Sequence, residues 1–409
     1  MTDPSAASNA PTPAESYSPL YFLAALGAGG LTVSFFMWLL FWTPHPGRPV
    51  PVFEDITAAL ATADLPLQVA IYAAWAGIAV FALIKIRLLV WNLGQFFAFR
   101  RTPAYEQLRR SNDETQLLAA PLTLAMAINV GFIIGLVFVP GLWSIVEYLF
   151  PAALLAFLLV GVWALNLMRD FWGRILTEGG FDCSRNNSFS QLLPAFALSM
   201  VGVGLAAPAA MSQTAWVAGV SYIASSFFVV LALTLAAVKL VIGLRAMMEH
   251  GANEVSAPSL WIMVPILTVC GIAVMRQQHG MHAHLGGHGA PADTFQMLTT
   301  FLSLQLAFAL FGWVVLRRQR YFERFVSGPE RSAGSYALVC PGVALTVMSH
   351  FFINKGLVGV GLIDKFGLAY WILNGIGFAL QAATIWLVLT LNAKHFGRSA
   401  RQPAPTPAE

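Results

Sequence analysis

The sequence predicts an all-α polytopic membrane protein with ten transmembrane helices, arranged as five parallel helical hairpins in a pseudo-fivefold ring around a central pore. Three observations support this fold class. The chain of 409 residues is 57% hydrophobic and only 10% charged, which excludes an ordinary soluble domain. It contains ten apolar stretches of about 20 residues or more, the length that a helix needs to cross a bilayer. A proline-containing stretch also recurs four times, and internal repeats indicate an architecture.

The ten apolar stretches must be helices, because lipid cannot hydrogen-bond the free backbone groups of open strands. They lie at residues 19–42, 66–92, 115–138, 143–168, 189–211, 215–244, 258–278, 293–316, 334–354 and 368–391. Together they form one transmembrane pore domain over residues 19–391. We predict disordered cytoplasmic tails at 1–18 and 392–409. The first tail is rich in Pro, Ala and Ser and lacks Lys and Arg, so it does not resemble a signal peptide.

The repeated stretch is the first helix of each predicted hairpin. It reads LLAAPLTLAMAINVGFI, SQLLPAFALSMVGVGLA, WIMVPILTVCGIAVMRQ and ALVCPGVALTVMSHFFI, with prolines at Pro121, Pro194, Pro265 and Pro341. The prolines are 73, 71 and 76 residues apart. A weaker copy, LYFLAALGAGGLTVSFF, opens the chain with glycines in place of the proline.

Two helices return the chain to its starting side, so every copy of the repeat has the same orientation. Parallel repeats of this kind are related by an axis along the membrane normal. We therefore predict that the five odd-numbered helices, four of them kinked at the prolines, line the pore, while the even-numbered helices face lipid.

The distribution of Lys and Arg predicts the orientation in the membrane. Most of the 23 basic residues, Lys85 among them, fall on the tail side, in the even-numbered loops and at their helix ends. The odd-numbered loops and their helix ends hold only Arg48, Arg276, Lys355 and Lys365. By the positive-inside bias, we expect both termini of this multi-pass membrane protein to lie in the cytoplasm. The net charge of +4 then reflects topology, and we expect no nucleic-acid partner.

At these residues the chain resembles the tellurite-resistance, C4-dicarboxylate and slow-anion-channel family, often called the TehA/SLAC1 type. The stretches YSPLYFLAALGAGGLTVSFFMWLLFWTPHP and NNSFSQLLPAFALSM are similar to its TsoY-like branch of selenoprotein-or-cysteine relatives. The resemblance implies ten helices in five hairpins, a pore for anions and a homotrimer. In channel members an aromatic residue near the ninth-helix kink closes the pore. Here that stretch reads Val339-Cys340-Pro341, so the closing residue has no counterpart beside the proline.

A constriction is predicted by counting eleven residues forward from each proline. This count reaches Phe132, Leu205, Arg276 and Phe352, with Phe35 or Phe36 at the corresponding place in the first copy. Equivalent positions in a ring form a layer, and a mostly apolar layer can close a pore by dewetting. The alternative is packing between hairpins, because aromatic residues at helical spacing usually belong to a core.

Four polar or charged residues are candidates for the pore. Arg276 and Lys355 end the seventh and ninth helices on the outer side, where positive charge would favour anion entry. Alternatively, both side chains reach the membrane interface. Asn129 and His350 lie within inner helices, where ionisable groups are functional candidates. A single histidine, however, more often satisfies a local hydrogen bond.

Cysteine and histidine suggest a second kind of chemistry. Cys340 precedes Pro341 and could respond to oxidation, although free cysteines in helices mostly act as small hydrophobic residues. The outer segment HGMHAHLGGHG contains His279, His282, His284 and His288. Imidazoles bind Zn, Cu or Ni, but no carboxylate or Cys completes a rigid site here.

These patterns predict a central pore, and the family resemblance implies that it carries anions. Together they predict passive or weakly selective transport of small anions across the bacterial inner membrane. The expected substrates are inorganic anions, oxidised sulfur or selenium species, or dicarboxylates. No phosphate-binding loop is evident, so we expect no coupling to ATP hydrolysis, no enzymatic activity and no cofactor. The alternative is a membrane redox- or metal-handling protein that uses Cys340 and the His-rich loop.

Overall fold

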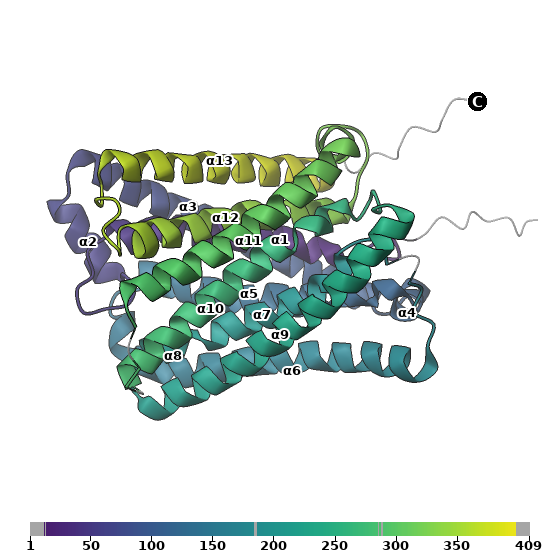
Figure 1. The fold of residues 1–409 in the computed structure, drawn as a ribbon, viewed down its shortest axis with the longest axis horizontal. Helices are drawn as coiled ribbons and strands as arrows, with labels where there is room; N and C mark the ends of the chain where they lie inside the picture. Colours follow the sequence, from purple (N-terminus) through teal and green to yellow (C-terminus); the bar gives the residue numbers. More distant parts are fainter. Residues whose placement is uncertain (1–11, 13, 184–185, 285, 288, 398–409) are drawn as a thin grey trace, which may run out of the picture.

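The computed structural model describes residues 12, 14–183, 186–284, 286–287 and 289–397 (Figure 1). All regular structure in these residues is helical, and ten segments are long and apolar enough to cross a membrane. The predicted all-α class and the ten spans are therefore confirmed. Most of the two predicted tails lies outside the described residues.

Each odd-numbered span joins a short 3-10 segment to an α-helix. The α-helices are α1 (Phe22–Trp42), α5 (Ala119–Phe138), α7 (Leu193–Leu205), α10 (Met263–His284) and α12 (Val339–Phe351). The 3-10 segments before them are η1 (Pro19–Tyr21), η2 (Asn112–Leu118), η4 (Ser190–Leu192), η5 (Ala257–Trp261) and η7 (Ala333–Leu338).

The even-numbered spans are longer helices. They are α3 (Leu65–Phe99), α6 (Val146–Glu178, after η3, Leu142–Ile145), α9 (Ala215–His250), α11 (Pro291–Arg318) and α13 (Leu368–Phe396). The remaining elements are α2 (Phe53–Thr62), α4 (Pro103–Arg109), α8 (Ala207–Met211) and two π-helical turns, η6 (Phe322–Val326) and η8 (Phe352–Leu357). Several even-numbered spans end later than their apolar stretches. A formed helix continues into polar residues such as Arg and Glu, which are good helix formers.

The four repeated prolines lie where the helix type changes. Pro121, Pro194, Pro265 and Pro341 each fall in the first turn of an α-helix that a 3-10 segment precedes. Proline suits this turn because its missing N–H would have no intrahelical acceptor there. The sequence predicted a bend within one continuous helix, whereas the structure has a junction between two kinds of helix.

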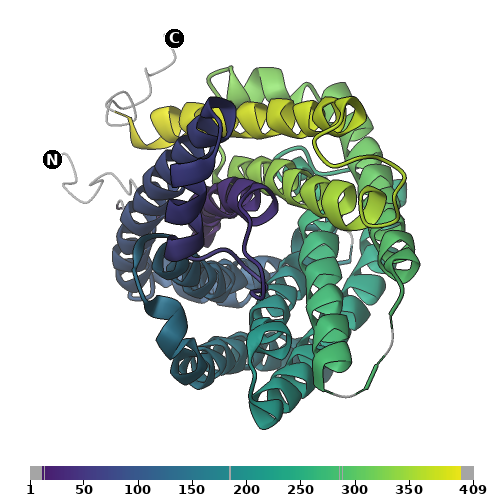
Figure 2. The same cartoon turned by 90° about the vertical axis from the view of Figure 1, so that its left-hand side faces the viewer.

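Burial separates the odd-numbered spans from the even-numbered ones. Within the most apolar part of each span, 56–94% of the residues are buried in the odd-numbered spans and 17–39% in the even-numbered spans. The inner helices also contact one another in a closed series: α1 contacts α5, α5 contacts α7, α7 contacts α10, α10 contacts α12, and α12 contacts α1. Figure 2 shows these helices inside the outer ones.

Polar side chains of the outer helices bind backbone carbonyls of the inner ones. Ser225 Oγ donates to Gly202 O at 2.8 Å, and Gln305 Nε2 donates to Val264 O at 2.9 Å. Without water, backbone groups inside a membrane must find partners within the protein. These bonds therefore hold α9 against α7 and α11 against α10.

The two ends of the bundle differ, and both names below refer to Figure 1. We call the end at which α2 and α8 lie the α2 end, and the end from which the termini extend the terminal end. The inner helices run from the terminal end to the α2 end. Near the α2 end, the completely buried Tyr370 hydroxyl accepts from Trp42 Nε1 at 2.9 Å and donates to Asn354 Oδ1 at 3.0 Å. This hydroxyl links α1, η8 and α13.

Tyr370→Phe is expected to destabilise the protein by about 1–3 kcal/mol, because it leaves the buried indole N–H of Trp42 and the half-buried amide oxygen of Asn354 without this partner. The measurement is thermal unfolding of the purified protein in detergent. Tyr148→Phe is the matched control, since Tyr148 is 82% exposed. Equal midpoints for the two variants would contradict a structural role for this hydroxyl.

Candidate functional site

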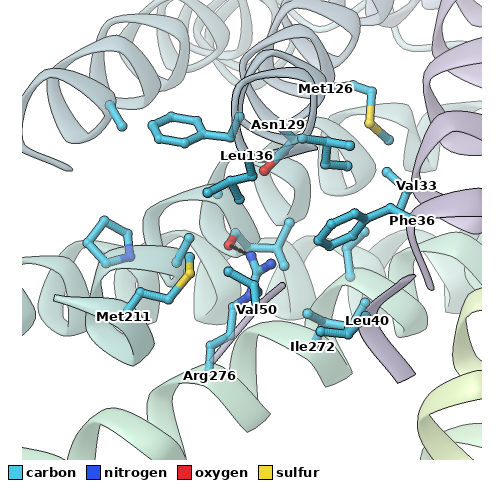
Figure 3. A pocket seen from close by; sticks show the side chains of 18 of the residues that line it. Val33, Phe36, Leu40, Val50, Met126, Asn129, Leu136, Met211, Ile272 and Arg276 are labelled. Carbon is cyan, nitrogen blue, oxygen red and sulfur yellow. Dashed lines mark hydrogen bonds between the residues drawn. The ribbon is translucent and has the colours of Figure 1, made fainter. Parts of the chain in front are cut away.

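A cavity enclosed by the inner helices lies near the α2 end. It has a volume of about 170 Å³, and all five inner helices contribute to its wall, together with η3, α6, α8 and Val50. We call it the vestibule. Its lining side chains are apolar apart from Asn129 and Arg276. Figure 3 shows these two side chains reaching into the vestibule from α5 and α10.

Arg276 is the charged group of the vestibule. Its Nη1 donates to the backbone oxygen of Val203 at 2.8 Å. Among the described residues, no carboxylate forms an ion pair with it. A guanidinium carries five N–H donors and stays protonated, so it retains both charge and donors. A full charge at 4 Å contributes about 4 kcal/mol at an effective dielectric constant of 20. The vestibule can therefore bind an anion.

A second cavity, of about 80 Å³, lies further toward the terminal end. We call it the inner cavity, and its wall also comes from the five inner helices. Six apolar residues line both cavities: Val33, Met126, Met200, Val269, Ile272 and Val347. We call these six the constriction. Each inner helix supplies at least one of them, so an apolar layer surrounds the junction of the two cavities.

The residues eleven positions after the prolines do not form one layer. Phe36, Phe132 and Arg276 line the vestibule. Leu205 is completely buried outside both cavities, and the ring of Phe352 stacks on Phe295 of α11, with centroids 6.1 Å apart.

The scatter has a different cause in each copy. Helix α12 gives way to the π-helical turn η8 at Phe352, which moves this side chain out of the α-helical register. Leu205 still belongs to α7, and it lies in the turn of α7 whose backbone binds Ser221 of α9. A fixed count along the sequence therefore reaches different faces in different copies.

The other pore candidates lie at separate places. Asn129 Nδ2 donates to Ala125 O at 3.2 Å and lies 3.9 Å from Met200 Sδ. His350 is buried outside both cavities, among the rings of Phe41, Trp42 and Phe378. Lys355 is exposed in η8. Of the four prolines, Pro265 lines the inner cavity, beside Gly27 and Gly30 of the first copy.

The candidates for redox or metal chemistry, Cys340 and the histidines, do not lie together. Cys340 is a free cysteine that lines the inner cavity. His284 Nε2 lies 2.9 Å from the backbone oxygen of Ser212, and His279 is exposed. His288 lies outside the described residues. Within the part of the chain that the structure describes, no group of three or more His, Cys, Asp or Glu side chains could hold a metal ion.

Residue type alone did not reveal the constriction. Met126, Met200 and Val347 are ordinary apolar residues, and nothing in their chemistry marks them. Each lies five or six residues past the proline of its own repeat, so counting a shorter distance along the aligned copies would have found them.

Comparison of the chain with protein-family models, with curated proteins and with solved structures found no match. The geometry described above is therefore the basis for assigning a function.

Proposed function

We propose that the protein transports small anions across the membrane through a central pore, as its resemblance to the slow-anion-channel family implies. The observation that carries this proposal is Arg276, a guanidinium without a carboxylate partner among the described residues, on the wall of an otherwise apolar vestibule. A cation there stabilises an anion and repels other cations. We propose both that the chain is a member of this family and that its substrates are small anions.

The proposed pore is a pseudo-fivefold ring of five hairpins. The closed series of contacts among α1, α5, α7, α10 and α12 supports this ring. The two cavities and their shared constriction support a path along its axis, since inner helices alone supply all residues of the constriction. The low burial of the even-numbered spans supports their role as the lipid-facing partners.

The composition of the path favours weak selectivity. Conduction requires that an ion bind well enough to enter and weakly enough to leave. One cation and one amide in an apolar vestibule meet both conditions for chloride, nitrate, sulfite or a small dicarboxylate. The apolar constriction can close the path by excluding water. We further propose a bacterial inner membrane location, cytoplasmic termini and a homotrimer.

The experiment is anion flux into proteoliposomes under an imposed voltage, comparing chloride, nitrate, sulfite, selenite and succinate. We expect voltage-driven flux with a reversal potential that follows the anion gradient and not the cation gradient. Absence of flux for every anion, with protein shown to be folded and inserted, would overturn the proposal. Thiol blocking and metal analysis would then test the redox- or metal-handling alternative, in which Cys340 acts from the inner cavity.

A further inference from the structure

A second cation lies inside the membrane, in the interior of α3. Lys85 is 1% exposed, although the sequence grouped it with the charges at helix ends. Its one hydrogen bond among the described residues runs from Nζ to the backbone oxygen of Thr123, at 3.3 Å. No carboxylate of the described chain pairs with it. An ammonium has three donors, and a buried charge without a partner is unfavourable. A small anion beside Nζ would compensate this charge and accept from the remaining donors.

Gly29 of α1 creates the space for this lysine. A β-carbon on Gly29 would lie 3.0 Å from Lys85 Cδ, 3.3 Å from its Cε and 2.8 Å from Met126 Cγ. The two side chains therefore meet over the bare backbone of Gly29. Met126 itself belongs to the constriction, so its side chain adjoins Lys85 as well as the two cavities.

We propose that Lys85 is a second anion-binding site, which an anion reaches when the side chain of Met126 turns away. Methionine has three rotatable bonds and adapts to different surroundings, so this movement needs no change in the helices. The proposal rests on the proposed function. In it, a small inorganic anion moves from Arg276 in the vestibule to Lys85 beside the constriction. Two weak sites in series suit conduction, because neither holds the ion permanently.

Lys239 is a buried lysine whose charge is stabilised by neighbouring side chains. It also lies on an outer helix, α9, and is 7% exposed. Its Nζ, however, lies 4.7 Å from the ring centre of Trp172 and 4.6 Å from that of Phe181. Aromatic faces stabilise an ammonium directly. Lys239 also lines neither cavity, so it serves as a matched control for Lys85.

The first test compares nitrate flux in proteoliposomes that contain wild type, Lys85→Met or Lys239→Met. We expect Lys85→Met to lower nitrate flux about tenfold, because it removes the attraction between the ammonium and the anion. Lys239→Met should leave nitrate flux unchanged. Met126→Ala should raise flux in both backgrounds because it widens the constriction, but the rise should be larger in wild type than in the Lys85→Met background, which is the coupling expected of two residues in contact. Equal effects of Met126→Ala in both backgrounds would overturn the proposal.

A binding measurement separates this site from transport. Nitrate should raise the melting temperature of the detergent-solubilised wild type by about 2–4 °C relative to gluconate at the same ionic strength. We expect a smaller rise for Lys85→Met and none for Arg276→Gln combined with Lys85→Met. If nitrate raises the melting temperature of Lys85→Met as much as that of wild type, Lys85 is not an anion-binding site. A different result is that the wild type binds nitrate through Lys85 and yet shows no anion flux. That result would support the site and overturn only the proposed function.

Discussion

Arg276→Gln is expected to lower anion flux at least about tenfold, and to abolish the preference for anions over cations. Glutamine keeps an amide in the vestibule but is shorter than arginine, so it also loses the hydrogen bond from Arg276 Nη1 to the backbone oxygen of Val203 at 2.8 Å. The substitution therefore removes the charge and keeps a polar group in the vestibule. The measurement is voltage-driven nitrate flux in proteoliposomes, with the reversal potential taken in a salt gradient.

Arg48→Gln is the control for this prediction. Arg48 also lies at the α2 end, in the connection before α2, but it forms an ion pair with Asp55. The hydrogen bond to that carboxylate raises the pKa of Arg48 above its usual value, so its charge is already compensated. We expect little change in flux for Arg48→Gln. If both arginine variants carry nitrate as wild type does, Arg276 does not select the anion.

The spans and their order could be predicted from sequence because a bilayer imposes one length on every helix that crosses it. The repeat identified the inner helices because proline recurs where four of the five change from 3-10 to α-helix. The odd-numbered spans are more buried than the even-numbered spans, as the repeat predicts.

The functional positions were harder to predict because they depend on local rotation of the helices. Arg276 was expected at a helix end, but α10 continues to His284, so Arg276 faces the vestibule and not the interface. Lys85 was expected near the tail side, but the missing side chain of Gly29 lets it enter the bundle. In the sequence, only Gly29 indicates this close approach between α1 and α3, and the chain contains 34 glycines.

Met200→Ala is expected to raise nitrate flux several-fold. Met200 is 2% exposed and belongs to the constriction. Alanine removes three heavy atoms from the layer that separates the two cavities. A narrow apolar layer excludes water and therefore ions, and its barrier falls steeply as it widens. The enlarged junction should stay hydrated for a larger share of the time, and the measurement is flux per inserted protein.

A loss of stability must be separated from a widened pore, because removing a buried Met side chain costs about 2–5 kcal/mol at any core position. Met168→Ala provides the comparison: Met168 is 6% exposed, packs in the core from α6 and lines neither cavity. Both variants should melt at a lower temperature than wild type, but only Met200→Ala should conduct more. If the two variants change flux equally, the effect is a general loosening of the bundle, and the constriction lies elsewhere along the path.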